Sequence, residues 1–470
     1  MTHTDNTGRR KCAVRSAGSA LPVISGLLLA FSLGACDSKR VLQVTDPDVA
    51  KPPALAGNAS IPVVYAGAIG DFAVSYSGNT GNEGEVGYSA LLTDEYLNAE
   101  TFPTRIEIDQ RITTADNANI VAVYRATQRA RASADFASTK IALANPNDVR
   151  RSETMSLAGF AINAMGEDYC SGSPISALTD AGEVVYGNQL TTAQLWDAAI
   201  AKFDSAITIA TANGASGVAQ LNLARVGKAR ALVNKGDYAT AATVVGPVPT
   251  NYVYLVTHSA NTNRENNGVF FWNTFNARFS ATDREGTNGL PFRTDADPRV
   301  AQVRTGGTAV GFDGITPLWT LNVAVSTWAP QGKYPSRAAS APLATGLEAR
   351  LIEAEAALKV NDPVTFLAKI QAEQSAQGVT QTTVLPLTLD GQVDLLFKER
   401  AYSLYFTGHR LGDMRRLIRQ YSRGAETVFP TGTFFHSGSA SGNYGTDVNI
   451  ILPNQEKNNP NFTGCLDRAA

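Results

Sequence analysis

The segment from residue 394 to residue 420 reads DLLFKERAYSLYFTGHRLGDMRRLIRQ and predicts two helices with a stop between them. In its first half, apolar residues recur at steps of three and four positions, the spacing that places side chains on one face of a helix. Gly408 then suits a left-handed helix end, which favours a residue without a side chain. Asp413 is predicted to cap a second helix from Met414 to Arg419. The wide apolar stripe indicates a first helix that is buried on more than one side.

Within this stretch, KERAYSLYFTGHRLGDMRR at residues 398–416 resembles a family signature. It is similar to the ER-x-x-E-L-x-F-E-G-x-R-x-x-D-L-x-R pattern near the C-terminus of SusD/RagB-type nutrient-uptake lipoproteins. The matching residues are Glu399, Arg400, Leu404, Phe406, Gly408, His409, Arg410, Asp413 and Arg416. Ser403, Thr407 and Leu411 depart from the pattern, where the family has an acid, a glutamate and an aromatic residue.

Two further segments resemble the same family, in the same order along the chain. LIEAEAAL at residues 351–358, preceded by an Asp-Pro-Arg turn at 297–299, is similar to its LI-x-AEA helix and D-P-R turn. ILPNQEKNNPNF at residues 451–462 is similar to its closing P-x-x-E-x-x-x-NPN pattern. The resemblance therefore extends over several separated motifs.

The first residues of the chain are predicted to be a lipoprotein signal. Residues 1–35 combine a basic start with an uncharged run, and Leu33-Gly34-Ala35-Cys36 fits a lipoprotein processing box. A membrane-spanning helix and an ordinary secretory signal are the alternatives, but Pro22 and several glycines interrupt the apolar run. We expect lipidation at Cys36, a tether over residues 36–60, and a single domain over residues 61–470.

Charge and composition argue for an exported, folded protein. Four basic residues and one acid leave with residues 1–35, so the formal net charge changes from −2 to −5. A mildly acidic chain lacks the electrostatic footprint of a nucleic-acid-binding protein, and no nucleic-acid partner is predicted.

Cysteine usage predicts one disulfide. Cys12 leaves with the signal and Cys36 is predicted to be lipidated, so two of the four cysteines remain, Cys170 and Cys465. In an oxidising compartment these two thiols are expected to form a bridge. Two unpaired, buried thiols are the alternative.

The middle of the chain shows helical pairs. Thr191-x-x-Gln194 predicts a capping box at the start of a helix that ends near residue 210. LARVGKARALVNKGDYATA at residues 223–241 resembles one tetratricopeptide unit, with small residues where two helices touch and Gly-Asp-Tyr at the turn. The predicted fold is mostly α, a tetratricopeptide-like scaffold of helical pairs with long irregular loops. The scaffold is expected mainly over residues 61–245 and 345–425.

Residues 246–341 are predicted to be a loop-rich ligand-binding region. Such a length of irregular chain inside a compact protein is usually functional. It holds three of the four tryptophans, and its aromatic residues lie among Asn, Asp and Arg, a composition suited to a sugar or peptide site. The candidate ligand-binding residues are Phe271, Trp272, Trp319 and Trp328. The alternative is that these rings anchor long loops to the helical body.

The family resemblance implies a surface lipoprotein of the outer membrane. It implies capture of an oligosaccharide or polysaccharide, or of a peptide, and delivery to a SusC-like TonB-dependent transporter. The residues alone leave open whether Glu399 and Arg400 face solvent or pair inside. The resemblance implies a fold-holding role for five signature residues, Glu399, Arg400, Gly408, Arg410 and Asp413.

Other classes of function are disfavoured by the motifs. HExxH, G-x-S-x-G, P-loop and paired CxxC motifs are absent, and the histidines occur singly, without the spacing of a zinc site. We therefore predict no catalysis, no cofactor and no metal, although abundant Asp and Glu pairs leave a carboxylate hydrolase open. The main rival is a periplasmic tetratricopeptide-type scaffold lipoprotein that binds only proteins; it predicts more complete repeats and no long aromatic loop region.

Overall fold

The computed structural model describes residues 57–179, 183–321, 333–436 and 440–470. Residues Leu55–Ala470 form one compact unit. The predicted signal, the lipidation site Cys36, most of the tether and the candidate ligand residue Trp328 lie outside the described residues. Within the described ranges, no helix is both long enough and apolar enough to span a bilayer.

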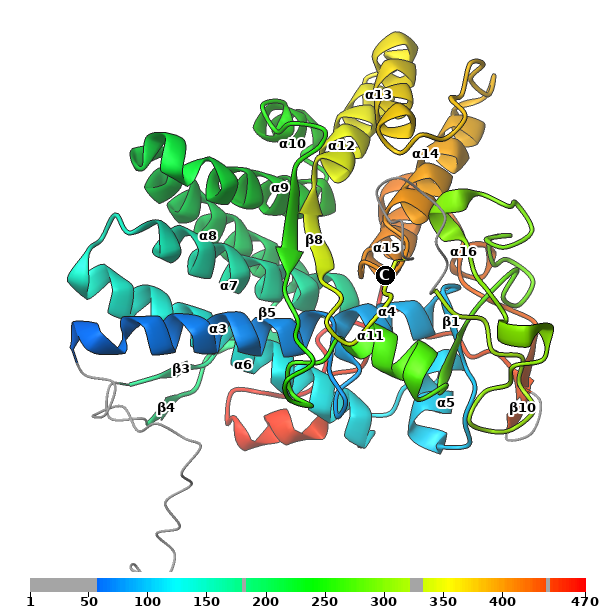
Figure 1. Ribbon diagram of the computed structural model, residues 1–470, viewed down its shortest axis with the longest axis horizontal. Coiled ribbons are helices and arrows are strands. Elements are labelled where there is room, and N and C mark those ends of the chain that lie inside the picture. The colour runs from blue at the N-terminus through cyan, green and yellow to red at the C-terminus, as the bar shows by residue number, and fades with distance from the viewer. Residues whose placement is uncertain (1–56, 180–182, 322–332, 437–439) are drawn as a thin grey trace, which may run out of the picture. The chain divides into compact units, whose positions relative to one another are not determined.

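Helices packed on their neighbours in the sequence form one part of the molecule (Figure 1). From α6 onwards successive helices contact each other, in the pairs α6 with α7, α7 with α8, α8 with α9, and α9 with α10, and α3 packs on α6. Their bounds are α3 Ile61–Tyr76, α6 Ala118–Ala144, α7 Val149–Asp168, α8 Thr192–Ala212, α9 Val218–Lys235 and α10 Tyr238–Val245. This arrangement confirms the predicted mostly α, tetratricopeptide-like fold class.

Side-chain caps start two of these helices, and a glycine lets two of them pack closely. The Asn117 side chain accepts from the backbone N–H of Asn119 and Ile120 at the start of α6. Thr191 and Gln194 form the predicted capping box of α8. Gly227 lets α9 approach α8 closely, because a β-carbon there would overlap the ring of Phe203. The predicted tetratricopeptide unit is the pair α9–α10.

A second helical group follows the loop region in the sequence. It consists of α12 (Gly346–Lys359), α13 (Pro363–Ala376) and α14 (Leu389–Ser403), followed by α15 (Arg410–Tyr421) and the short α16 (Ala425–Val428). The helix α12 packs on α10, α13 and α14, and so joins this group to the first one. A separate hydrophobic cluster lies between α12, α13 and α14. Its buried members include Leu351, Leu358, Phe366, Ile370, Leu396 and Phe397.

Short strands and single turns fasten the loops. The strands form antiparallel ladders of two, namely β1 (Tyr96–Asn98) with β7 (Phe279–Ala281), β6 (Val253–Val256) with β8 (Ala341–Thr345), β2 (Ser173–Pro174) with β5 (Gln189–Leu190), β3 (Ala177–Leu178) with β4 (Val184–Val185), and β9 (Thr433–His436) with β10 (Ala440–Asn443). The remaining helices are α4 (Gly84–Leu92), α5 (Pro103–Asp109) and α11 (Gly268–Phe270). In the β1–β7 ladder, Leu97 is opposite Ser280, so the loop region is tied directly to the N-terminal part of the domain.

Candidate functional site

The predicted fold-holding residues lie on α14 and α15 and in the turn between them. The four charged ones, Glu399, Arg400, Arg410 and Asp413, are at most 6% exposed. Charged side chains are rarely buried to this degree unless they are paired. Their partners therefore show what the signature does in the fold.

The carboxylate of Asp413 accepts hydrogen bonds from two arginines. Arg400 donates from Nε to Oδ2 at 2.8 Å, and Arg416 donates from Nη2 to Oδ1 at 2.9 Å. Arg416 also contacts Glu355 of α12 at 2.5 Å. Burial alone would raise the pKa of Asp413, but the two guanidinium groups outweigh it and lower the pKa to about 2. This network joins α12, α14 and α15.

The other two charged residues reach different parts of the chain. Arg299 of the predicted D-P-R turn contacts Glu399 at 2.6 Å and Asp297 at 2.8 Å. Arg410 forms a bidentate pair with Asp94, at 2.6 and 2.8 Å. The signature thus forms separate buried pairs rather than one cluster, and each pair fastens α14 or α15 to a distant segment.

The turn between α14 and α15 lies earlier in the chain than predicted, because α14 ends at Ser403 rather than at Gly408 and α15 begins at Arg410. Gly408 has φ 74°, the left-handed value that the sequence predicts there. The predicted helix start at Met414 is wrong, since α15 begins at Arg410 with His409 before it. Asp413 is consequently inside the first turn of the helix and accepts from arginine side chains.

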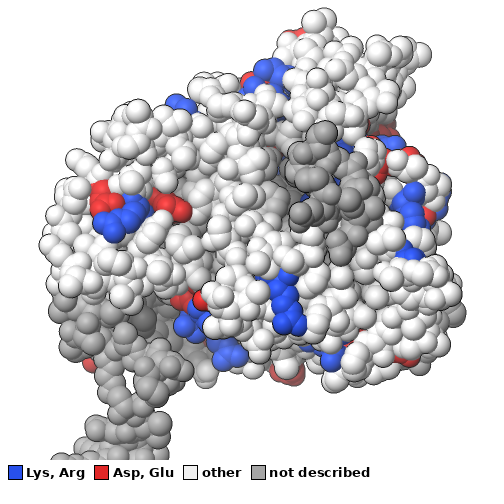
Figure 2. Space-filling model, in the orientation of Figure 1, with Lys and Arg blue, Asp and Glu red and all other residues white. Residues whose placement is uncertain are grey.

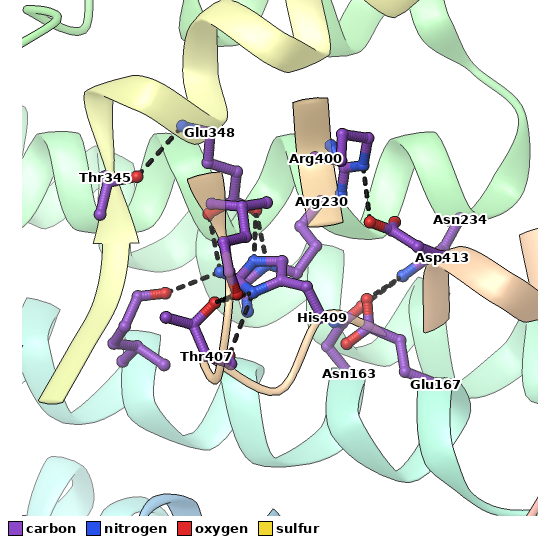
Figure 3. A network of polar contacts seen from close by, with 12 residues as sticks. Asn163, Glu167, Arg230, Asn234, Thr345, Glu348, Arg400, Thr407, His409 and Asp413 are labelled. Atoms are coloured by element: carbon purple, nitrogen blue, oxygen red, sulfur yellow. Dashed lines mark hydrogen bonds and ion pairs between the residues drawn. The ribbon is translucent and has the colours of Figure 1, made fainter. Parts of the chain in front are cut away.

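A polar network beside this turn completes the buried core (Figure 3). Arg230 of α9 donates to Glu348 of α12 from Nε at 2.7 Å and from Nη2 at 2.8 Å. The His409 Nε2 atom lies 3.3 Å from the same carboxylate. Burial would raise the pKa of Glu348, but Arg230 and His409 hold it far below its usual value. All of these contacts are internal to the domain.

The loop region presents exposed aromatic rings. Phe102, Phe275 and Phe312 are 47%, 57% and 54% exposed. The Arg278 guanidinium lies between two of them, 5.0 Å from the Phe102 ring centre and 4.2 Å from that of Phe312. Arg337 lies 3.9 Å from the Phe275 ring centre. We call these five residues the aromatic platform.

Two of the predicted ligand residues, Phe271 and Trp272, lie in the same short turn as Phe275 of the platform. Phe271, Trp272 and Phe275 belong to a short π-helical turn, Phe271–Phe275, a geometry that is frequent at functional sites. Phe271 packs against Phe275 at 5.6 Å and against Trp272 at 5.1 Å, measured between ring centres. It is partly buried against the hydrophobic core.

Trp272 is placed as a core residue. It is 6% exposed, with Arg105 4.5 Å from its ring centre and Phe279 5.9 Å away. Its Nε1 donates to the carbonyl of Asn82 at 3.1 Å. Because its ring and its only polar atom are covered, Trp272 offers no free surface to a ligand here, and its position matches the loop-anchoring alternative.

Trp319 is intermediate between these cases. The Arg293 guanidinium lies 3.8 Å from its ring centre, and the side chain packs against the core. Its carbonyl accepts from Ala281 at 2.9 Å and from Asn273 at 3.0 Å, which attaches this segment to β7 and to the π-helical turn. Trp328 lies outside the described residues.

The two rings beside Arg278 were not among the predicted ligand residues. Phe312 is at the tip of the turn Gly311-Phe312-Asp313-Gly314, in which Asp313 accepts from the N–H groups of Ile315 and Thr316. An aromatic residue inside such a tight Gly-Asp turn has few neighbours to bury it, so this local signal was available. Phe102 precedes α5 and gives no comparable signal.

Charged groups are sparse on the face shown in Figure 2, where they form small groups among uncharged side chains.

The two remaining cysteines lie together, and the sulfur atoms of Cys170 and Cys465 are bonded at 2.03 Å. This bridge joins the segment after α7 to the C-terminal tail. No group of three or more His, Cys, Asp or Glu among the described residues is arranged to hold a metal.

Comparison with known proteins finds similarity in structure only. No protein-family model matches the chain, and no curated protein matches it in sequence. A SusD-like protein from Bacteroides fragilis superposes with a TM-score of 0.61 at 13% identity, over 89% of this chain and 100% of that one.

Two other solved structures match as well. A SusD-like carbohydrate binding protein from Bacteroides fragilis has a TM-score of 0.60 at 14% identity, over 87% of this chain and 99% of that one. A laminarin binding SusD-like protein has a TM-score of 0.59 at 14% identity, with the same coverage of 87% and 99%. Nearly the whole length of each structure is matched, and the chain therefore has the SusD-like fold.

Proposed function

We propose that this protein is an outer-membrane lipoprotein that binds a glycan at the aromatic platform and delivers it to a SusC-like TonB-dependent transporter. The observation that carries the proposal is the exposed rings of Phe102 and Phe312, whose centres lie 5.0 and 4.2 Å from the Arg278 guanidinium. Flat apolar rings stack on the C–H faces of sugars, while neighbouring guanidinium groups donate hydrogen bonds to hydroxyls.

The fold supports the choice of ligand class. Structures of the same fold are named as carbohydrate binding and laminarin binding proteins. The proposed anchor is a lipid on Cys36, which rests on the Leu33–Cys36 box. More than one acyl chain on such a cysteine gives stable attachment to a membrane.

Ligand binding is tested by native affinity electrophoresis in gels that contain laminarin, starch or another soluble polysaccharide. We expect at least one polysaccharide to retard the wild-type protein and the double variant Phe102→Ala/Phe312→Ala to migrate freely. Tyr186→Ala removes a ring of similar exposure, 46%, outside the platform and is the matched control. Retardation that survives the double variant would move the site away from the platform.

The transporter partner is tested separately, by affinity purification of the lipidated protein from gently solubilised outer membranes. We expect a large TonB-dependent barrel to co-purify with it. Recovery of soluble periplasmic proteins without a barrel would favour the scaffold alternative.

A further inference from the structure

A cavity lies between α3, α7 and the segment that follows β6. Its volume is about 540 Å³, within the usual range for sites that hold small molecules. Its apolar wall includes Ile69 of α3 and Leu157 of α7, and none of its lining residues belongs to the platform. The cavity is therefore a separate place at which a ligand can bind.

One buried carboxylate lines this cavity. Glu153 of α7 is 9% exposed, and each of its oxygens accepts from a tyrosine hydroxyl. Tyr65 of α3 donates to Oε2 and Tyr254 of β6 donates to Oε1, both at 2.7 Å. Burial and the nearby carboxylate raise the pKa of both tyrosines, so both remain donors at neutral pH. The two hydroxyls hold the carboxylate in place.

The arginines and the histidine near Glu153 are engaged elsewhere. Arg150, one turn earlier in α7, pairs with Asp148 at 2.6 Å. Arg264 at the rim pairs with Asp71. Burial lowers the pKa of His258, whose Nε2 lies 2.5 Å from the hydroxyl oxygen of Ser77. Among the described residues, no Lys, Arg or His forms an ion pair with Glu153.

A buried carboxylate without an ion-pair partner, in a cavity that two tyrosines also line, is suited to a cation from outside the chain. A carboxylate in a poorly solvated site gains from an opposite charge, and the faces of tyrosine rings attract ammonium and guanidinium groups.

We propose that the cavity between α3, α7 and β6 binds the ammonium or guanidinium group of an organic cation, with Glu153 as its anionic partner. This chemistry is found in an unacetylated amino sugar and in the basic side chain of a peptide. The proposal is independent of glycan binding at the platform, because the two sites share no residue.

The test uses pairs of probes that differ in charge. Calorimetric titration compares the β-1,4-linked disaccharide of glucosamine with its N,N′-diacetyl form, and the N-acetyl amide of lysine with that of norleucine. We expect the charged member of at least one pair to bind at least ten-fold more tightly than the neutral member. The pair that shows this difference identifies the sugar or the peptide as the source. Equal binding within both pairs, or no binding by either cation, overturns the proposal.

The residue is tested with matched substitutions. Glu153→Gln keeps the shape of the side chain but replaces one acceptor oxygen with an NH2 donor and removes the charge, and we expect it to abolish the preference for the charged probe. Asp197→Asn makes the equivalent change at a carboxylate that does not line the cavity, is 59% exposed and pairs with Lys235, and we expect less than a two-fold effect. If the wild-type preference for the cation persists in Glu153→Gln, the proposed site is wrong.

Discussion

An arginine next to a phenylalanine ring occurs both in the helical core around α14 and α15 and in the aromatic platform, but the two pairs differ in burial. In the core, the Arg416 guanidinium lies 5.2 Å from the ring centre of Phe397, which is 3% exposed. In the platform, Arg278 lies 4.2 Å from the ring centre of Phe312, which is 54% exposed. The contact alone does not define a role. Burial of the ring decides whether the pair stabilises the fold or remains open to a ligand.

The two regions also differ in how the charges are compensated. In the core, one arginine serves two carboxylates, since Arg416 contacts Glu355 at 2.5 Å and Asp413 at 2.9 Å. In the platform the Arg278 side chain is 16% exposed, and its carboxylate partner, Glu100, also contacts Arg105 at 2.7 Å. Loss of one charge should therefore lower the free energy of unfolding strongly in the core and only slightly in the platform.

The largest expected effect follows from removing the charge of Asp413. Asp413→Asn leaves two buried guanidinium groups without their shared carboxylate, and we expect the free energy of unfolding to fall by about 3–5 kcal/mol. Urea denaturation of the folded domain measures this. Asp197→Asn is the matched control, because its carboxylate is 59% exposed and pairs with Lys235 on the surface. That control should cost less than about 1 kcal/mol. Similar losses in both variants would contradict the assignment of the signature to stability.

The core was predictable from local patterns. The apolar stripe, the left-handed glycine at 408 and the capping box at Thr191 each depend on a few neighbouring residues, and each is observed. The start of α15 was predicted wrongly, because the pairing of Asp413 with Arg400 and Arg416 depends on the packing of two helices. From the sequence alone, a carboxylate near the start of a helix is interpreted as a helix cap, because the packing of α14 on α15 is not visible there.

The platform was predictable only as a region. The composition of residues 246–341 indicated aromatic loops, but the exposure of each ring depends on non-local contacts. The pairing of β1 with β7 and the turn at Phe271–Phe275 bury Trp272 and leave Phe275 exposed, although both are aromatic residues of the same short segment. Phe102 joins Phe312 through Arg278, across more than two hundred positions of sequence.

A smaller effect is expected from pH, again in the core. Burial raises the pKa of Glu373 to about 7, although Arg299 acts in the opposite direction. Below its unfolded pKa, near 4.5, Glu373 is protonated in both states. As the pH rises towards 7 the unfolded state loses this proton first, so this residue lowers the free energy of unfolding over that interval, by roughly 1–3 kcal/mol.

Glu373→Gln tests that interval directly. The variant should lose this part of the pH dependence and gain stability relative to the wild type as the pH rises from about 4.5 to about 7. Denaturation midpoints at several pH values for the two proteins measure the difference. Parallel curves would show that Glu373 titrates normally in the folded protein.

The smallest expected effect on stability separates the two regions most clearly. Arg278→Lys keeps a positive charge for Glu100 but replaces the flat guanidinium between Phe102 and Phe312 with a compact ammonium group. We expect the free energy of unfolding to change by less than about 1 kcal/mol, because the rings are already half exposed and Arg105 still pairs with Glu100. Affinity for the retarding polysaccharide should nevertheless fall about three- to ten-fold, since the rings lose the plane that sets their spacing.

The same substitution in the core provides the contrast. Arg416→Lys cannot reach Glu355 and Asp413 together, because one ammonium group replaces two donor nitrogens directed at different carboxylates. It should reduce stability and leave the affinity of the folded protein unchanged. If Arg278→Lys destabilised the protein as much as Arg416→Lys and left affinity intact, the platform would be an extension of the core, and its exposed rings would need another explanation. A loss of affinity without a loss of stability would establish that an arginine held between exposed rings serves binding, whereas the same residue on a buried ring serves the fold.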